Sequence, residues 1–400
     1  MKSQLFKKIS IVLLLFFFIL TAGCSGDKTT QPEQNPIKIG LLVPYTGVFA
    51  SNGYDITRGI ELYFDEIGWK AAGLEIKLLK EDSEMKGPVA LQKARRLVES
   101  EQIDILTGIV SSSVAYALRD YIVANEVPLI LANAGAAELT KEQGSKYIFR
   151  VSFANGQYEY PMGDYVFNEL KLGKITVLAP DYAAGHEKAQ GFMDGFKTSG
   201  GEIIQEIYPP LGTTDFGPYL AQINKDADAV WVHFSGTDSI SFVNQYAEYG
   251  LKDKIPLLSS GDLVDESSLP HQGDAPIGII SSHHYSAALN TPENQKYVKD
   301  YRAKYNDDPN MFSEQGYVAA RVTVEAIEAL EGDISDTEKL LSSIKKVEFK
   351  APRGPFSFDP KTQNVIFDTY IRKTEKIDGK LRNTVIHTIP ADKNPWYLLK

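Results

Sequence analysis

The sequence predicts an α/β protein of two doubly wound lobes, each built on a parallel sheet with helices on both faces. Short apolar runs alternate with amphipathic stretches, as in consecutive βαβ units. The alternation occurs in two separate series, at residues 37–131 and 175–280. Residues 37–400 are also long enough for about two domains of ~150 residues each.

The first series is predicted to alternate between strand and helix. Residues 37–43 (IKIGLLV) form an apolar strand that stops at Pro44. Residues 54–69 carry apolar side chains at helical spacing, which predicts an amphipathic helix. The same reasoning gives strands at 74–79, 103–110 and 127–131, and helices at 89–98 and 113–125.

The second series repeats the pattern. Its predicted helices lie at 188–197, 219–225 and 239–249, and the last ends at Gly250, a residue typical of a helix C-terminus. Its predicted strands lie at 175–178, 202–207, 229–232, 256–258 and 277–280.

The last third of the chain departs from this alternation. Helices are expected at 294–305 and 314–330, followed by antiparallel strands at 365–372 and 384–389. If these helices return to the first lobe and these strands to the second, the chain crosses between the lobes more than once. Several crossings would form a hinge.

The first residues predict export and attachment to a membrane. Lysines 2, 7 and 8 precede an apolar run at 9–20, which has the length of a signal-peptide core and is too short for a comfortable bilayer span. The run ends in Leu20-Thr21-Ala22-Gly23-Cys24, which resembles the lipobox of bacterial lipoproteins. We therefore expect a signal peptide at 1–23, an acyl anchor on Cys24 and a flexible polar tether at 24–36.

The composition argues against several classes of function. A formal net charge of -10 disfavours binding to nucleic acid or to anionic lipid. The sequence has no dinucleotide fingerprint after its first strand, no phosphate loop, and no zinc-protease or nucleophile-elbow motif. No cofactor and no metal are expected, and the pair His283-His284 is interpreted as a strand end with one ring inside and one outside. Binding without catalysis is the simplest remaining role.

Candidate ligand contacts follow the predicted strands, because ligands of open parallel sheets bind at the carboxyl ends of the strands. Three serines follow the strand at 103–110, and their hydroxyls and the free N–H groups of the next helix suit a carboxylate. One serine would suffice as a helix cap, so three favour a ligand contact. Small residues after the strand at 127–131 let a ligand approach the backbone. The candidates of the first lobe are Ser111, Ser112, Ser113, Asn133, Ala134 and Gly135.

The second lobe offers two matching junctions. Tyr182 follows the strand at 175–178 and is placed to stack on a solute from the opposite side. Asp262 follows the strand at 256–258 and suits an ammonium group. Ordinary packing for the tyrosine and helix capping for the aspartate are the alternative interpretations. Weaker candidates, each alone more typical of a core, are Phe49, Asn52, Phe153, Gln157, Phe234, Ser235 and Tyr285.

At these residues the chain resembles the leucine/isoleucine/valine-binding family of type I periplasmic binding proteins. The matching pieces are residues 37–47 (IKIGLLVPYTG), the serines 111–113, residues 133–140 (NAGAAELT), residues 149–152 (FRVS), residues 179–185, and Pro270 with His284-Tyr285-Ser286. The resemblance implies two lobes joined by three crossovers that close around one ligand. It places residues 37–152 and 285–352 in the first lobe, and residues 153–284 and 353–400 in the second.

The resemblance leaves two ligand classes open. In the family, the serine run and the loop after the next strand hold the ligand carboxylate. An acid at the position of Asp262 accompanies an α-amine, which favours an amino acid of the branched-chain type. However, Gly135 stands where amino-acid binders commonly have a hydroxyl residue. The surrounding loop is more similar to the branch of the family that takes up aromatic and other organic acids.

The resemblance also implies a partner, the permease of an ABC transporter. The binding protein is expected to be a monomer, held outside the cytoplasm by its lipid anchor. A ligand-sensing subunit of a receptor system is the alternative role. An amidase-like enzyme on the same fold is disfavoured, because no nucleophile stands beside a base.

Overall fold

A computed structural model describes residues 35–394 and residue 396. The predicted signal peptide, Cys24 and the predicted tether up to residue 34 lie outside these residues. Across the described part of the chain, no helix combines the length and the apolar character that crossing a bilayer requires.

The first lobe is built on a six-stranded sheet in the order β2-β3-β1-β4-β5-β6. All pairs are parallel except β2 with β3. Strands β4, β5 and β6 are buried along their whole length, as expected for parallel strands covered on both faces. The bounds are β1 (Ile37–Val43), β2 (Lys70–Ala71), β3 (Leu74–Asp82), β4 (Ile105–Gly108), β5 (Leu129–Leu131) and β6 (Ile148–Arg150).

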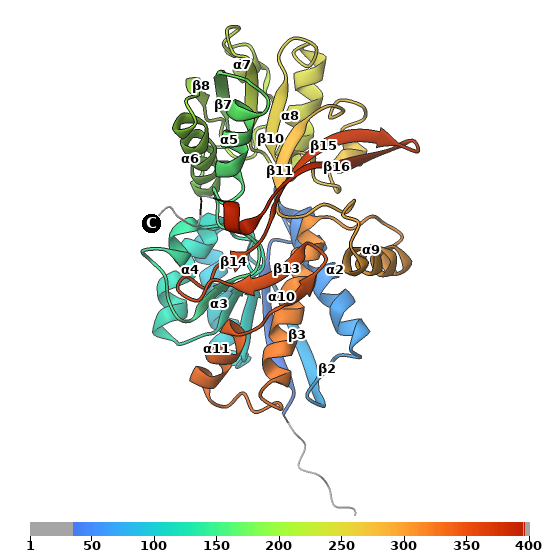
Figure 1. Cartoon of the computed structure of the whole chain (residues 1–400). Coiled ribbons are helices and arrows are strands. Elements are labelled where there is room, and N and C mark those ends of the chain that lie inside the picture. Colours follow the sequence, from blue (N-terminus) through green and yellow to red (C-terminus); the bar gives the residue numbers. More distant parts are fainter. Residues whose placement is uncertain (1–34, 395, 397–400) are drawn as a thin grey trace, which may run out of the picture. The chain divides into compact units, whose positions relative to one another are not determined.

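Helices from two distant parts of the chain cover this sheet (Figure 1). The early ones are α2 (Ala50–Glu66), α3 (Gly87–Arg95) with the π-helical turn η1 (Arg96–Ser100), α4 (Ser112–Ala124) and the 3-10 turn η2 (Ala137–Thr140). The late ones are α9 (Pro292–Tyr305), α10 (Met311–Glu328) and α11 (Thr337–Lys345). The return of the late helices to the first lobe agrees with the expected crossings.

Two glycines let α2 and α10 pack at very short range. A Cβ atom at Gly59 would lie 1.8 Å from the carbonyl oxygen of Ser313, and one at Gly316 would lie 2.1 Å from that of Ile56. Because no side chain fits at either position, the two helix backbones touch directly. This contact fixes the start of α10, which is also secured by a capping box between Asn310 and Ser313.

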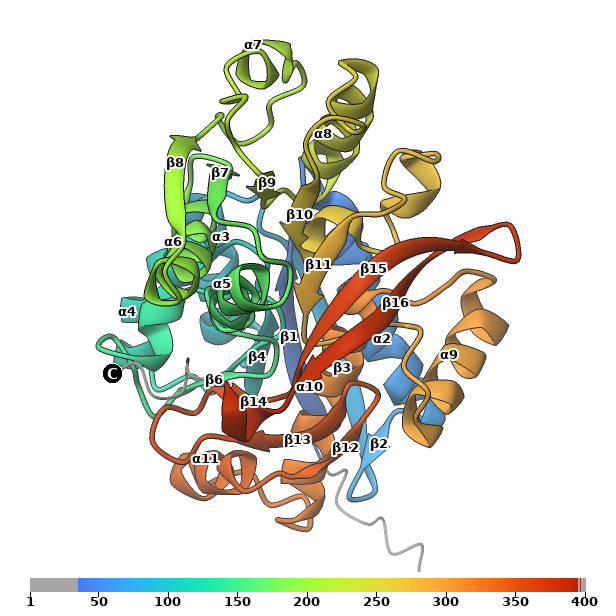
Figure 2. The ribbon, with the colours of Figure 1, turned by 45° about the horizontal axis from the view of Figure 1, so that its top comes forward.

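The second lobe is built on a seven-stranded sheet in the order β16-β15-β11-β10-β9-β7-β8. Strands β7, β8, β9, β10 and β11 run parallel. A long antiparallel hairpin of β15 and β16 extends the sheet beside β11 (Figure 2). The bounds are β7 (Lys174–Leu178), β8 (Glu202–Ile207), β9 (Ala229–Val232), β10 (Leu257–Ser260), β11 (Ile280–His283), β15 (Thr369–Ile377) and β16 (Lys380–Ile389).

Each face of the second sheet has its own core. Successive residues of β9 alternate between the faces, so that Val230 and Val232 pack on the side of α8, whereas Ala229 and Trp231 pack on the side of α5 and α6. The helices and turns of this lobe are α5 (Glu159–Asn168), α6 (Ala183–Thr198), α7 (Gly217–Leu220), α8 (Thr237–Glu248), η3 (Gly261–Val264), η4 (Leu269–His271) and η5 (Ala391–Lys393).

The chain crosses between the two sheets after β6, after β11 and again before β15. A small sheet of β12 (Phe349–Ala351), β13 (Gly354–Phe358) and β14 (Val365–Ile366) precedes the last crossing. Phe356 and Phe358 of β13 pack in the core of the first lobe. The boundary between the lobes at residue 353 stays a prediction. The packing of β13 in the first lobe favours a boundary at about residue 368.

Two buried arginines hold the crossing segments. Arg353 forms a bidentate ion pair with Glu314 of α10 and donates to the carbonyl of Val151 at 2.7 Å, in the first crossing. Arg372 of β15 donates to the carbonyl of Tyr285 at 2.8 Å, in the second crossing. Buried backbone carbonyls in irregular segments need donors of this kind, since no sheet supplies them.

Several local predictions differ from the structure. The helix predicted at 219–225 is only the single turn α7, and the strand predicted at 365–372 is broken into β14 and β15. His283 and His284 are both fully buried, so the prediction that one ring points outward is wrong. Phe153 of the first crossing lies beside both rings, and Phe367 lies beside the ring of His284.

The glycine contact between α2 and α10 gives a stability prediction. Gly59→Ala should lower the free energy of unfolding by about 1–3 kcal/mol or more, because the added Cβ must push the two helices apart. Urea denaturation would measure this loss. Gly173→Ala is the matched control and should change stability little, since the atom nearest to its added Cβ lies 3.7 Å away. Equal stability of both variants would contradict the described packing.

Candidate functional site

A small cavity of about 20 Å³ lies between the carboxyl ends of the strands of the two sheets. Its wall is formed by segments that follow β1, β4, β5 and β6 in the first lobe and β7, β9 and β10 in the second, together with the start of α10. The lining residues are Phe49, Asn52, Val110, Ser112, Asn133, Gly135, Phe153, Asn155, Tyr182, Ala184, Lys188, His233, Ser235, Asp262 and Phe312.

A sharp turn presents the N-terminus of α4 to this cavity. The chain leaves β4 through Gly108 at φ 104° and Ile109 at φ 61°, and a β-branched residue rarely adopts the second value. The backbone of Ile109 is held there by hydrogen bonds with Leu42 and Ala134. Backbone strain of this kind is typical of ligand-binding loops. The turn places Ser112 in the cavity wall, where its hydroxyl accepts a hydrogen bond from Asn155.

The loop after β5 is fitted closely to Asn155. A Cβ atom at Gly135 would lie 2.2 Å from Asn155 Oδ1, and the carbonyl of Gly135 accepts from the backbone N–H of Asn155 at 2.7 Å. Glycine therefore stands here because the carboxamide of Asn155 fills the space of a side chain. Asn133 in the same loop donates to Gln315 of α10 at 2.7 Å.

Arg150 stabilises this loop through hydrogen bonds. Its buried guanidinium donates to the carbonyls of Ala134 and Ala136, and to the Thr140 hydroxyl at 2.6 Å. Burial lowers the pKa of Arg150 to about 10, so the group stays charged at neutral pH. The wall of the first lobe is thus preorganised by the protein itself.

Aromatic rings from both lobes close the cavity. Phe49 of the first lobe and Tyr182 of the second have ring centroids 6.2 Å apart. Phe153 lies on the first crossing, and Phe312 belongs to the first turn of α10. Burial raises the pKa of Tyr182 well above its ordinary value, so its hydroxyl remains protonated.

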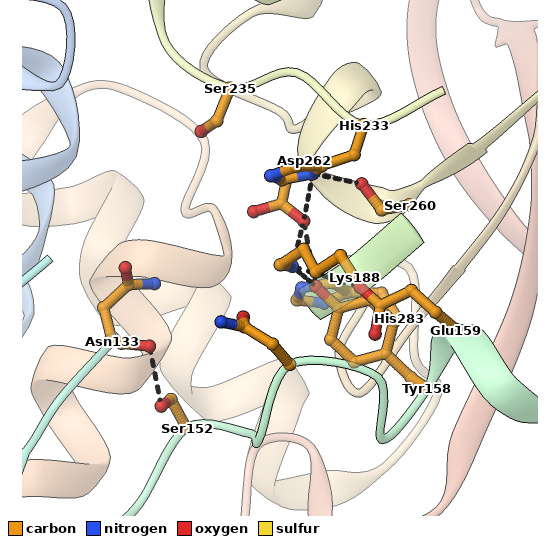
Figure 3. A network of polar contacts seen from close by, with 12 residues as sticks. Asn133, Ser152, Tyr158, Glu159, Lys188, His233, Ser235, Ser260, Asp262 and His283 are labelled. Atoms are coloured by element: carbon orange, nitrogen blue, oxygen red, sulfur yellow. Dashed lines mark hydrogen bonds and ion pairs between the residues drawn. The ribbon is translucent and has the colours of Figure 1, made fainter. Parts of the chain in front are cut away.

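The Lys188 side chain reaches into the wall of the second lobe and is almost fully buried. Its Nζ lies 2.8 Å from Asp262 Oδ2 and 3.2 Å from Glu159 Oε1, and it donates to the Tyr158 hydroxyl. That hydroxyl in turn donates to Asp262 Oδ2 at 2.9 Å. The ammonium also lies 4.3 Å from the ring centroid of Phe153. Figure 3 shows Lys188, Tyr158 and Asp262 converging on one point.

Burial and charge together set the protonation of this cluster. Burial favours a higher pKa for Asp262, but the charge of Lys188 and its neighbours outweighs it and holds the pKa below its ordinary value. Burial raises the pKa of Glu159 to about 7, although Lys188 opposes the shift. Asp262 is therefore firmly ionised, whereas Glu159 titrates near neutrality.

Two residues of the cavity wall carry a buried polar atom without a hydrogen-bond partner among the described residues. His233 Nδ1 lies 2.7 Å from the Ser260 hydroxyl, and burial lowers the pKa of His233 to about 3, so the ring is neutral. Within residues 35–394 and 396, neither His233 Nε2 nor Asn155 Oδ1 has a hydrogen-bond partner, although both are buried. Buried polar atoms are normally satisfied, so a polar ligand or water is expected to meet them.

The structure brings many of the predicted contact residues together. Those that line the cavity are Phe49, Asn52, Ser112, Asn133, Gly135, Phe153, Tyr182, Ser235 and Asp262. Their direct contact with a ligand stays a prediction. The interpretation of Asp262 changes, however, because its cationic partner is already supplied by Lys188.

Other predicted residues lie outside the wall. Ser111 is the N-cap residue of α4, Ser113 is exposed on that helix, and Ala134 contributes backbone bonds. Gln157 and Tyr285 lie on the first and second crossings, where their side chains bond to the Val365 carbonyl and to Asn294. Phe234 points to the opposite face of the sheet, where it packs on Phe216 and Phe242. Packing of the hinge and the core explains these positions, and contact of these residues with a ligand stays a prediction.

Sequence reasoning missed Val110, Asn155, Ala184, Lys188, His233 and Phe312. A signal for Lys188 was present, because it lies four residues after Ala184 and four before Phe192, on the buried face of α6. A lysine on such a face is rarely buried unless it is paired. His233 directly follows a predicted strand. Phe312 has no local signal, since it reaches the site from α10.

Two α/β lobes joined by three crossings, with a buried cavity between their strand ends, define a solute-binding protein of the hinged, two-lobed class. A family model described as "Periplasmic binding protein" matches residues 36–380. The chain therefore belongs to the periplasmic binding protein family, as the resemblance in the sequence had predicted. This family comprises extracytoplasmic solute-binding proteins rather than enzymes.

Individual relatives agree with this assignment. "Leu/Ile/Val-binding protein homolog 6" of Brucella melitensis is 29% identical, over 97% of this chain and 98% of its own length. An ABC transporter substrate-binding protein from Sphaerobacter thermophilus is 40% identical, with a TM-score of 0.85 over 90% of this chain and 99% of that one. A solute-binding protein of an ABC transporter from R. palustris, solved in complex with benzoate, is 34% identical, with a TM-score of 0.83 over 88% and 96% of the two chains.

The raised pKa of Glu159 predicts a pH-dependent stability. A carboxyl group whose pKa is about 7 when folded and about 4.5 when unfolded stabilises the fold fully below pH 4.5, and this contribution is lost as the pH rises through 7. The free energy of unfolding of Glu159→Gln, taken relative to that of the wild type, should therefore rise by about 2 kcal/mol as the pH is raised from 5 to 8.

Urea titrations of the ligand-free protein at several pH values would measure this trend. Glu169→Gln, an exposed change at the end of the same helix, should show no such trend. A relative stability of Glu159→Gln that falls with pH would contradict the prediction.

Proposed function

We propose that this chain is the extracytoplasmic solute-binding component of an ABC importer, and that it closes its lobes around a small, mainly apolar carboxylate. The observation that carries this proposal is the buried cavity, which combines an anion-compatible wall with aromatic rings. Cys24 would carry the lipid anchor, and the permease would be the partner of the closed form. The binding step needs no bond to be made or broken.

The wall of the first lobe suits the carboxylate. The first N–H groups of α4 have no carbonyl partners within the helix, and they point to the end where Ser112 lines the cavity. The Asn155 carboxamide is hydrogen-bonded to Ser112 and fixes the orientation of that hydroxyl. Neutral donors and a helix dipole can bind a carboxylate without the desolvation cost of a fixed cation.

The rings of Phe49, Phe153, Tyr182 and Phe312 suit a flat apolar body. Relatives from R. palustris and Rhodopseudomonas palustris BisB5, at 34% and 33% identity, were solved with benzoate and with 3,4-dihydroxy benzoic acid. These complexes support an aromatic carboxylate as the ligand of this chain. A branched-chain amino acid is the second candidate, favoured by the name of the Brucella relative.

Contacts between the lobes support closure as the mechanism. Glu187 of α6 accepts from the Tyr116 hydroxyl at 2.5 Å and from the Ala137 N–H at 2.9 Å, both in the first lobe. Asn52 donates across the cavity to Ser235 at 3.2 Å. These bonds exist only while the lobes face one another, so they stabilise the closed state that a ligand would select.

The requirement for a carboxylate group on the ligand is tested with a pair of matched ligands. Benzoate should bind and benzamide should bind at least tenfold more weakly, since benzamide keeps the ring and loses the charge. Ser112→Ala should weaken benzoate binding about ten- to a hundredfold, as expected for a lost hydrogen bond to a charged group. Isothermal titration calorimetry would measure both effects.

Ser113→Ala is the internal control for this experiment, because Ser113 is exposed on α4 and should leave affinity unchanged. Equal losses from the two serine variants would argue against α4 as the carboxylate site. Binding of neutral or cationic compounds alone would refute the carboxylate class.

The hydrogen bonds that Glu187 accepts from the first lobe predict an effect on ligand release. Glu187→Ala should raise the dissociation rate of benzoate about tenfold, because the closed state loses hydrogen bonds that join the lobes. Stopped-flow release measurements would show it. Asp194→Ala, an exposed change on the same helix, should not alter the rate. An unchanged rate for Glu187→Ala would exclude a role in closure.

A further inference from the structure

The Lys188 ammonium is ion-paired with Asp262, the carboxylate of the cavity wall that would suit the ammonium group of an amino-acid ligand. We propose that Lys188 is a specificity-determining residue that occupies this carboxylate from within the protein, so that the site accepts carboxylates without an α-amine and rejects amino acids. This inference rests on the proposed function and narrows its substrate class.

The Lys188 ammonium is held by two hydrogen bonds and an ion pair. It donates to the Tyr158 hydroxyl and to Asp262 Oδ2 at 2.8 Å, and it pairs with Glu159 Oε1 at 3.2 Å. Asp262 Oδ2 accepts from both Lys188 and Tyr158. The same oxygen therefore has little remaining capacity for a donor from a ligand.

The surroundings hold the lysine in place. The ammonium lies over the rings of Phe153 and Tyr158, at 4.3 and 4.6 Å from their centroids. Glu159 and Tyr158 lie behind it, outside the cavity wall, whereas Asp262 lines the cavity beside it. A lysine held between two buried carboxylates cannot swing into solvent without leaving both uncompensated.

The charge of Lys188 then opposes the approach of a second cation to Asp262. An ammonium that approached Asp262 from the cavity would meet the charge of Lys188 at the same carboxylate, and both would lie in a buried wall where solvent screens little. His233, whose Nδ1 lies 3.7 Å from Asp262 Oδ2 in the same wall, is neutral. A plain carboxylate avoids this repulsion, because it brings no cation.

Matched ligands that differ only in the α-amine test the proposal. The pairs are leucine with 4-methylpentanoate and phenylglycine with phenylacetate, and benzoate serves as the reference carboxylate. Isothermal titration calorimetry on the purified wild-type protein should show that each plain acid binds at least a hundredfold more tightly than its amino acid.

Substitution of the lysine should shift this preference. In Lys188→Met, Asp262 is free to accept a ligand ammonium, so the ratio of affinities should move at least tenfold towards the amino acid. The double variant Lys188→Met with Asp262→Asn has neither charge and should again prefer the plain acid. Lys197→Met, an exposed change on the same helix, should leave the ratio unchanged.

A second variant provides the same test in case Lys188→Met does not fold. Lys188→Met leaves two buried carboxylates, and the addition of Glu159→Gln removes one of them while keeping Asp262 available. If Lys188→Met does not fold, the same shift is expected in this double variant. An unshifted ratio in whichever of these two backgrounds folds would overturn the proposal.

The outcomes separate this inference from the proposed function. Wild-type protein that binds both members of a pair equally would overturn the role of Lys188 and leave the proposed function standing. Wild-type protein that binds no carboxylate of the set would overturn the proposed function, and this inference with it.

Discussion

The bidentate ion pair between Arg353 and Glu314 is the interaction on which the site depends. Arg353 precedes the last crossing and binds carbonyls of the first, while Glu314 lies in the first turns of α10. A buried guanidinium needs a full set of acceptors, so the pair fixes three distant segments at once. The cavity exists only where those segments bring the strand ends of both lobes together.

A second group of buried charges gives the cavity its chemical character. Lys188, Asp262 and Glu159 meet where water is largely excluded, so each charge is tolerable only because the others compensate it. The first lobe presents neutral donors and a helix N-terminus to the cavity, whereas the second presents a wall whose charges are already paired.

The sequence predicted the sheets better than the site. Continuous apolar strands such as β1 and β9 carry their own signal, and so do residues directly after strands, such as Ser112 and Asn133. Gln157 and Tyr285 lie outside the cavity wall because hinge packing uses the same kinds of side chain. Phe312 lies far from the other site residues in the chain, and the pairing of Lys188 with Asp262 depends on how α6 packs beside β10. Neither can be derived from local pattern alone.

The close fit between Gly135 and Asn155 has a consequence for how such sites diverge. Because the carboxamide fills the space above the glycine, a larger residue at 135 would require a smaller one at 155. The two positions must therefore change together, in evolution or in protein engineering. A designer who wishes to reshape this pocket should vary them together, because a library that varies position 135 alone would consist mostly of clashing variants.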